Sequence, residues 1–352
     1  MPVVVAAPDK FRGSATAVEV AGAVARAASR SGWSVIESPL SDGGEGLLEV
    51  VRRPGDQLET TEVTGPLGTP VRATWLLGSD RCVIEMARAS GLTLAGGPDR
   101  NRPMEATTRG TGQLLVAAAR ALAATGNPSH SEEPPPTIIV GIGGSATTDG
   151  GLGALEAIEE AGGLGRVELI GACDVLVGFL DAARVFGPQK GATPPQVAEL
   201  VERLDRLADQ YQTRFGVEVR DVPGAGATGG VGGAVVALGG RLETGYRLVA
   251  GLVGLGRSLH QADLVITGEG ALDATSFAGK VVGGVLGDAS AIGVPALVFA
   301  GRATTEAIDL AQEYGAQVVS LSDRFGEARS LGDTVHCVEE AVTQALAAFN
   351  VA

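Results

Sequence analysis

Residues 137–151, TIIVGIGGSATTDGG, combine an apolar run with glycines, small hydroxyl residues and a carboxylate. The consecutive β-branched residues 138–140 predict a buried strand. The glycines that follow, Gly141, Gly143 and Gly144, permit positive φ angles and let backbone N–H groups approach an anion closely. The stretch therefore predicts a loop that binds phosphate.

Hydroxyl residues and an acid follow these glycines. Ser145, Thr147 and Thr148 are expected at the start of the next helix, where the partial positive charge of the helix N-terminus favours an anion. Asp149 is the kind of ligand that a magnesium-bound nucleotide requires. The loop lacks the lysine of a P-loop and the spacing of GxGxxG. The alternative is a tight turn beneath a helix.

Only three lysines occur in the chain, Lys10, Lys190 and Lys280, and each lies in a glycine-rich or turn-like motif. The ordinary place for a lysine is the solvated face of a helix. These positions therefore indicate lysines that neutralise a bound anion.

Charged residues also follow three of the predicted parallel strands. The carboxyl ends of parallel strands meet at one edge of a sheet, where ligands bind. We therefore expect these residues to face a single site. They are Asp9 and Lys10, Asp42 and Glu45, and Glu269 and Asp273.

Glycine-rich loops with carboxylates and lysines, and without a usable Cys or His set, favour magnesium-dependent phosphoryl transfer over hydrolysis by a Ser or Cys nucleophile. The reaction needs a carboxylate that orients or deprotonates the acceptor hydroxyl. The candidates are Asp174, Asp42 and Asp273.

Structural alternatives exist for several of these residues. Asp42 also suits an Asp-Gly turn, and Glu45 suits a capping box. Arg109 also suits an ion pair with Glu105. The second glycine-rich segment, 223–233, also suits close helix packing.

The net charge of −14 argues against a nucleic-acid or membrane-surface partner. Three cysteines without metal-binding spacing indicate a reducing compartment. The beginning of the chain lacks the pattern of a signal peptide, and no apolar run is long enough for a membrane helix. We expect a cytoplasmic protein.

The pattern predicts an α/β protein of two domains. A flavodoxin-like parallel sheet of five strands is expected from residues 1–56 plus 260–352. A second, mixed α/β domain, 57–259, interrupts it, beginning with an antiparallel meander and carrying the glycine-rich loops. Residues 194–215 predict a long amphipathic scaffold helix.

The chain resembles the class I glycerate kinases, the bacterial glycerate 2-kinase family. The resemblance rests on motifs in family order along nearly the whole chain. They include APDKFRGSATAVEVA (7–21), SDGGEG (41–46), EMARASGL (85–92), TTRGTGQL (107–114), RVFGPQKGA (184–192), PGAGATGGVG (223–232) and LVITGEGALD (264–273). The segment between Gly151 and Cys173 is shorter than is usual in that family.

This resemblance implies ATP-dependent phosphorylation of D-glycerate to 2-phosphoglycerate with Mg²⁺, in a cleft between two α/β domains. The alternatives are a kinase for another small hydroxy acid, a kinase that forms 3-phosphoglycerate, and a non-catalytic nucleotide-binding relative. We expect a monomer or a homodimer.

Loop position and charge lead to a hypothesis for the role of each residue. The ATP-binding residues would be Gly141, Gly143, Gly144, Ser145, Thr147, Gly224, Gly226 and Lys280. The glycerate-binding residues would be Lys10, Asp9, Arg109 and Glu45, and the magnesium ligands Asp149, Glu269 and Asp273. Asp174 would act as the base, with Lys190 and Asp42 as further catalytic residues.

Overall fold

The computed structural model describes residues 1–125 and 134–349. The chain forms two compact units. The first unit contains Met1–Asp42, Glu49–Val51 and Thr244–Ala352, and the second contains Gly43–Leu48 and Arg52–Glu243. Among the described residues, no helix combines the length and the apolar character that crossing a bilayer requires.

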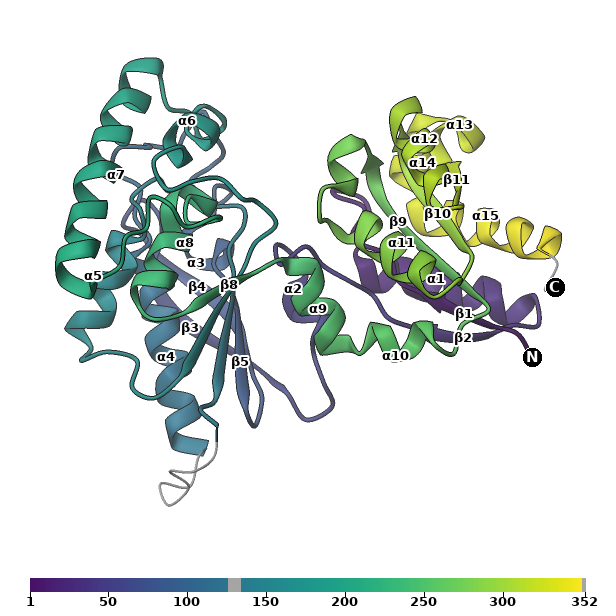
Figure 1. The fold of residues 1–352 in the computed structure, drawn as a ribbon, viewed down its shortest axis with the longest axis horizontal. Coiled ribbons are helices and arrows are strands. Elements are labelled where there is room, and N and C mark those ends of the chain that lie inside the picture. The colour runs from purple at the N-terminus through teal and green to yellow at the C-terminus, as the bar shows by residue number, and fades with distance from the viewer. Residues whose placement is uncertain (126–133, 350–352) are drawn as a thin grey trace. The chain divides into compact units, whose positions relative to one another are not determined.

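The first unit is built on a parallel sheet of five strands, in the order β11-β10-β9-β1-β2. The strands are β1 (Val3–Ala6), β2 (Ser34–Glu37), β9 (Leu264–Leu272), β10 (Ala296–Ala303) and β11 (Gln317–Ser320). β1, in purple, pairs with β9, in green, although the two are far apart in sequence (Figure 1). Counted within the sheet, the order is 2-1-3-4-5, which doubly wound flavodoxin-like sheets share. The predicted five-stranded parallel sheet is confirmed.

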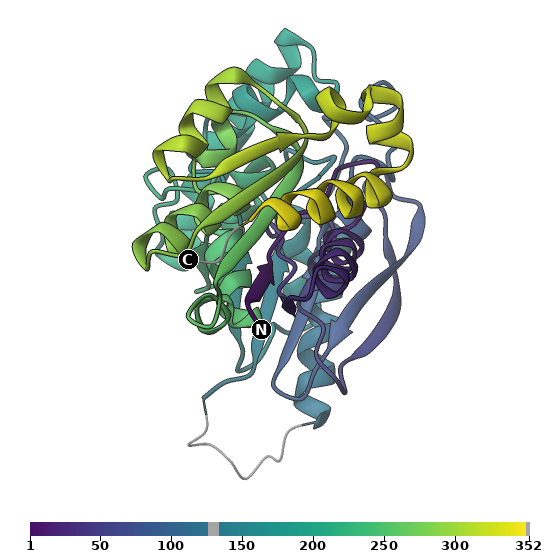
Figure 2. The ribbon, with the colours of Figure 1, turned by 90° about the vertical axis from the view of Figure 1, so that its right-hand side faces the viewer.

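Helices cover this sheet. They are α1 (Ala17–Arg30), α9 (Gly245–Val253), α10 (Leu255–Leu259), η2 (Ala274–Phe277), α11 (Val281–Ala291), α12 (Thr305–Glu313), α13 (Leu321–Phe325), α14 (Glu327–Gly332) and α15 (Thr334–Ala348). Helix α1 packs against α15 (Figure 2). Arg26 and Arg30 of α1 both donate hydrogen bonds to Glu339 of α15, which ties the two ends of the chain together.

Residues 244–259 lie within the segment that we expected to form the inserted domain, but they group with the first unit. The hydroxyl of Tyr246 on α9 donates to Asp288 Oδ2 on α11 at 2.6 Å. A Cβ added at Gly284 would lie 2.3 Å from the Tyr246 ring, so only glycine lets the ring lie against α11 there. This contact joins α9 to the first unit.

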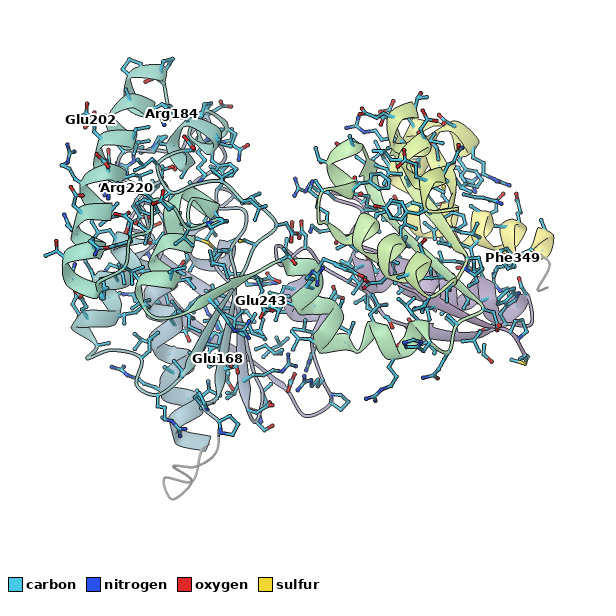
Figure 3. All side chains as sticks on the ribbon, viewed as in Figure 1. Glu168, Arg184, Glu202, Arg220, Glu243 and Phe349 are labelled. Atoms are coloured by element: carbon cyan, nitrogen blue, oxygen red, sulfur yellow. The ribbon has the colours of Figure 1, made fainter. Side chains whose placement is uncertain are left out.

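The second unit contains a mixed sheet of six strands, in the order β3-β4-β5-β6-β7-β8. The strands are β3 (Gln57–Thr64), β4 (Pro70–Leu77), β5 (Arg81–Glu85), β6 (Thr137–Gly141), β7 (Glu168–Ala172) and β8 (Arg241–Glu243). The first three strands are antiparallel and β5 to β8 are parallel. Figure 3 labels Glu168 and Glu243 on neighbouring strands, and Arg241 forms ion pairs with both. The predicted antiparallel start of a mixed domain is confirmed.

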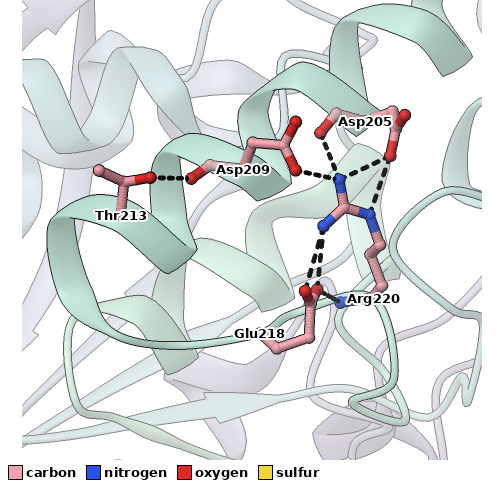
Figure 4. Close-up of polar contacts among 5 residues, drawn as sticks. All are labelled: Asp205, Asp209, Thr213, Glu218 and Arg220. Carbon is pink, nitrogen blue, oxygen red and sulfur yellow. Dashed lines mark hydrogen bonds and ion pairs between the residues drawn. The ribbon is translucent and has the colours of Figure 1, made fainter.

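The helices of the second unit begin with α2 (Leu47–Val50), which crosses the boundary between the units. The others are α3 (Ala87–Ser90), α4 (Arg109–Thr125), α5 (Leu152–Glu160), α6 (Ala182–Phe186), η1 (Pro188–Lys190), α7 (Pro194–Phe215) and α8 (Ala227–Ala237). Helix α7 has the predicted bounds. Its polar side holds Arg220, which donates to Asp205 Oδ1 and Asp209 Oδ1, both at 2.7 Å (Figure 4). These ion pairs attach the segment after α7 to the polar side of the helix, as expected for a helix with a structural role.

Candidate functional site

The loop between β6 and α5, residues 142–151, is the predicted phosphate-binding loop. Several of its amides already have protein partners: Ile142 N donates to Ala172 O, and Ala146 N donates to Ser90 O. By contrast, the amides of residues 143–145 donate to no protein acceptor within the described parts of the chain. Gly144 is exposed and has φ +67°. Consecutive unpaired amides around a left-handed residue can bind an anion.

The hydroxyl residues of this loop lie before the helix and not at its N-terminus. Helix α5 begins at Leu152, after Gly150 and Gly151, which have φ of 68° and 83°. The expectation that Ser145, Thr147 and Thr148 start a helix was therefore wrong. Left-handed backbone at the two glycines is incompatible with a helix that starts earlier.

Asp149 is buried between the starts of two helices. Its Oδ2 accepts hydrogen bonds from the backbone N and the hydroxyl of Thr108, both at 2.8 Å, and from Gly153 N at 3.3 Å. Its Oδ1 accepts from Gly151 N at 3.1 Å. Four protein donors thus occupy the carboxylate that we expected to bind magnesium. In this position it joins α4 to α5.

Lys190 lies beneath the phosphate-binding loop with only 3% of its surface exposed. Its Nζ donates to Ser145 Oγ at 2.9 Å and to the backbone oxygen of Thr147. Burial lowers the pKa of Lys190 to about 7, against the opposing effect of the Asp149 charge. The structure thus brings Lys190, Ser145 and Thr147 together across 45 and 43 residues of sequence.

The second glycine-rich segment packs against the first. Among the described residues, Thr228 is the one non-glycine with positive φ, and Gly229 and Gly230 continue the left-handed run. A Cβ added at Gly229 would lie 2.1 Å from Thr147 O. The amide of Gly226 donates to Val177 O at 2.9 Å, so a protein acceptor already occupies it. These contacts are typical of close packing, which the sequence allowed as the alternative to phosphate binding for this segment.

Glu85 is a buried carboxylate to which the sequence reasoning assigned no role. The register of β5 and β6 places it beside Gly141. Its Oε1 accepts from Leu48 N at 3.1 Å, and its Oε2 accepts from Arg88 Nε at 2.7 Å. The sequence feature that could have indicated this residue is an acid at the end of the apolar run CVIE. Glu85 holds the start of α2 against the sheet.

The first unit contains a second group of charges, at the carboxyl ends of β1 and β9. Lys10 Nζ donates to Asp42 Oδ1 at 2.8 Å and lies 3.8 Å from Asp9 Oδ1. Burial lowers the pKa of Lys10, but the charges of Asp9 and Asp42 outweigh burial and raise it overall. Burial also raises the pKa of Glu269, and the charge of Asp42 adds to that effect. We call Asp9, Lys10, Asp42 and Glu269 the acid–lysine cluster.

Asp9 is the most perturbed acid of this cluster. Burial raises its pKa to about 7, the charge of Lys10 opposes that shift, and the charges of Asp42 and Glu269 add to it. A carboxyl group with this pKa takes up or releases a proton near neutral pH. Such groups are frequent in functional sites.

Two other predicted residues of the first unit lie around η2. Asp273 Oδ1 accepts from the N and the hydroxyl of Thr275, at 2.8 and 2.6 Å, and these bonds lower the pKa of Asp273. Lys280 Nζ donates to the same hydroxyl at 2.9 Å. Asp273 therefore caps η2, and its charge lies near enough to Glu269 to raise the pKa of that residue.

The remaining predicted residues lie in the second unit. Arg109 forms a two-point ion pair with Glu160 of α5, and its other suggested partner, Glu105, pairs with Arg102. Glu45 is exposed, and Asp174 is half-buried beyond the end of β7. In this conformation the Arg109 guanidinium, predicted to bind glycerate, is held by Glu160.

The arrangement of acidic side chains bears on magnesium binding. No group of three or more His, Cys, Asp or Glu residues within 1–125 and 134–349 is placed to hold a metal ion. Magnesium in kinases is usually held by one or two carboxylates together with phosphates and water. Asp42 and Glu269, whose charges influence each other, fit that smaller set.

Comparisons with known proteins agree with this chemistry. A family model described as the Glycerate kinase family matches residues 4–163 and 159–350. The chain is 38% identical to an uncharacterized protein of Mycobacterium tuberculosis, over 94% of this chain and 90% of that protein. It is 36% identical to the glycerate 2-kinase of Escherichia coli, over 90% of this chain and 89% of that protein.

A solved structure is also similar. It is a crystal structure of a Salmonella typhimurium LT2 protein assigned as glycerate kinase 2, with a TM-score of 0.79 and 32% identity. The match covers 99% of this chain and 98% of that one. Sequence and fold thus agree along nearly the whole length, and the chain belongs to the glycerate kinase family.

Proposed function

We propose that this protein transfers the γ-phosphoryl group of ATP to the 2-hydroxyl of D-glycerate and forms 2-phosphoglycerate and ADP. Family membership supports the reaction class, and the name of the Escherichia coli relative supports the 2-position. The observation that carries the proposal is the row of unpaired amides at residues 143–145 above the buried Lys190. Amides and a lysine supply the charge neutralisation that phosphoryl transfer needs.

The phosphate-binding loop is proposed to hold the ATP phosphates. The amides of Gly143, Gly144 and Ser145 contact phosphate oxygens in this proposal. Gly141 and Thr147 shape the loop. Lys190 holds the loop in place through Ser145 and adds positive charge close beneath it.

The other predicted ATP-binding residues have supporting roles. Gly224 and Gly226 support the loop through close packing, because the Gly226 amide already has a protein acceptor. Lys280 neutralises charge beside Glu269, where its own charge opposes the rise that burial causes in the pKa of Glu269. Asp149 is proposed to keep α4 and α5 aligned behind the loop.

The acid–lysine cluster is proposed to bind the acceptor. Lys10 pairs with the carboxylate of D-glycerate, Asp9 and Glu45 accept hydrogen bonds from its hydroxyls, and Asp174 takes the proton of the reacting hydroxyl. Phosphoryl transfer places donor and acceptor in line.

Magnesium would be held by Glu269 and Asp42, with Asp273 close by. When bound, it neutralises phosphate oxygens during transfer. Arg109 joins the carboxylate of glycerate only if it leaves Glu160. We further propose a monomer or a homodimer.

Purified protein with ATP, Mg²⁺ and D-glycerate tests the reaction through ADP release and phosphorus NMR of the product. Glycerate-dependent ADP together with a 2-phosphate signal supports the proposal. A 3-phosphate signal would mean that the protein is a glycerate kinase that phosphorylates the 3-hydroxyl. Glycolate and hydroxypyruvate serve as competing acceptors. ATP binding without ADP release would instead indicate a non-catalytic relative.

A further inference from the structure

The first unit contains a pocket of about 780 Å³ that the proposed function does not use. It lies at the carboxyl ends of β9 and β10 and is closed by α13 and α14. Ligands of doubly wound sheets bind at this end of the strands. Its volume is in the usual range for sites of small molecules and cofactors. Its polar lining includes Arg12, Arg302, Ser322, Asp323, Glu327 and Ser330.

Two arginines of this pocket have no acidic partner. Arg12 and Arg302 are exposed, and within residues 1–125 and 134–349 neither guanidinium forms an ion pair. Asp323 and Glu327 line the same pocket without reaching them. Two guanidinium groups that share one pocket suggest an anionic ligand.

The two strands lie close together where they line the pocket. A Cβ added at Gly301 would lie 2.4 Å from Gly270 O, so glycine allows the backbones to approach there. Ser330 Oγ donates to Gly301 O at 3.3 Å and ties α14 to β10. Leu331, with 58% of its surface exposed, adds apolar surface to the wall. A ligand with an apolar or ring portion can pack there.

The lining combines two kinds of polar group. Guanidinium groups bind phosphate by paired hydrogen bonds. Carboxylates such as those of Asp323 and Glu327 accept hydrogen bonds from hydroxyl groups, as acids do from ribose in dinucleotide sites. We infer that this pocket binds an organic phosphate that also carries hydroxyl groups, with Arg12 and Arg302 on the phosphate and Asp323 and Glu327 on the hydroxyls.

Two sources can supply such a ligand. One is a nucleoside phosphate such as ATP, whose base would pack on Leu331. The other is a phosphorylated organic acid such as 2-phosphoglycerate, which would act as an effector. The pocket borders the acid–lysine cluster, because Gly270 follows Glu269 and a Cβ at Gly270 would lie 3.0 Å from Arg12 N. A ligand in the pocket would therefore change the electrostatic surroundings of the acid–lysine cluster.

A fluorescent reporter tests the inference in the full-length protein. Cys82, Cys173 and Cys337 are all buried, so Gly332→Cys, next to the pocket residue Leu331, supplies one accessible thiol for an environment-sensitive dye. Labelled protein is titrated with ATP, 2-phosphoglycerate and inorganic phosphate. We expect ATP or 2-phosphoglycerate to change the emission and Arg302→Gln or Arg12→Gln to weaken that response about tenfold.

Arg257→Gln is the matched control. Arg257 is another exposed arginine of the first unit, and it does not line the pocket. The Arg257→Gln substitution removes the same charge and should leave the affinity for the organic phosphate unchanged. A response to ATP identifies a nucleotide site, and a response to 2-phosphoglycerate with none to ATP identifies an effector site. The inference is overturned if no organic phosphate changes the emission, or if both pocket variants respond like the Arg257→Gln control.

This binding assay needs no turnover. A protein without kinase activity can still show the predicted response, and an active kinase can lack it. The outcome for the pocket is thus separate from the outcome for the proposed reaction. Thermal unfolding of each labelled variant verifies that it is folded.

Discussion

Lys190 Nζ donates a hydrogen bond to Ser145 Oγ at 2.9 Å, and this bond attaches η1 to the underside of the phosphate-binding loop. The same nitrogen reaches the backbone of Thr147. The lysine is thus placed to set the position of the unpaired amides at residues 143–145.

Replacing Lys190 with methionine should disable catalysis while the fold is kept. The substitution removes the charge and both hydrogen bonds but retains an unbranched apolar side chain in a buried place. We expect kcat to fall about 100-fold, a loss typical of removing one preorganised electrostatic group. Ser145→Ala removes one of the two acceptors and should cost less. Near-normal turnover of Lys190→Met would show that the lysine has no part in the reaction.

The same lysine should make stability depend on pH. Its pKa is about 7 in the folded protein and near 10.5 in the unfolded chain, so the unfolded state binds more protons between these values. The free energy of unfolding should therefore rise as the pH increases from about 7 toward 10. Denaturant titrations across this range should show a smaller rise for Lys190→Met than for the wild type. Equal slopes would mean that Lys190 stays charged in the fold.

Asp9 should have the opposite effect at lower pH. Its pKa is about 7 in the folded protein and near 3.8 in the unfolded chain, so the folded state binds more protons between these values. Its contribution to the free energy of unfolding is present below about pH 4 and declines as the pH rises through 7. Asp9→Asn should flatten this part of the profile. Asp263→Asn, which removes an acid that accepts a hydrogen bond from Val3 N, is the control.

Gly229→Ala should destabilise the second unit strongly. The added Cβ would lie 2.1 Å from Thr147 O, at a residue with φ +76°. We expect a loss of about 2–4 kcal/mol, from steric overlap and backbone strain together. Gly251→Ala on α9 is the matched control, because its Cβ would meet nothing within 4 Å. There we expect equal or slightly greater stability, since alanine favours a helix over glycine. A similar melting temperature for both variants would contradict the packing.

Arg109 and Glu160 allow a test of the substrate role proposed for Arg109. If the arginine must leave Glu160 to reach glycerate, Glu160→Gln should lower KM for glycerate, by less than about fivefold because the pair is exposed. Arg109→Gln should raise the same KM. Unchanged KM in both variants would restrict Arg109 to the contact between α4 and α5.

Local patterns in the sequence were sufficient for much of the fold. Runs of β-branched residues predicted the five parallel strands, because a strand buried on both faces is apolar throughout. Alternating polarity predicted the antiparallel start of the second unit. Helix α7 was predicted with its observed bounds from its amphipathic pattern and alternating charges.

The same patterns did not indicate the protein partners of several site residues. Asp149 and Gly226 have the residue types of metal and phosphate sites, but Thr108, Gly153 and Val177 take up their hydrogen-bonding capacity. These partners are distant in sequence or lie on other elements. Competition for a hydrogen bond is decided by which groups are brought within about 3 Å, and spacing along the chain does not determine that.

The sequence by itself determined the family, the strand pattern and the glycine-rich loop, because these depend on residue type and on neighbours along the chain. Only the tertiary structure decided that Lys190 is buried beneath that loop, that Asp9 lies beside Lys10 and Asp42, and that 244–259 group with the first unit. Burial and electrostatics depend on what surrounds a side chain in space. The pKa of about 7 at both Lys190 and Asp9 arises from that enclosure.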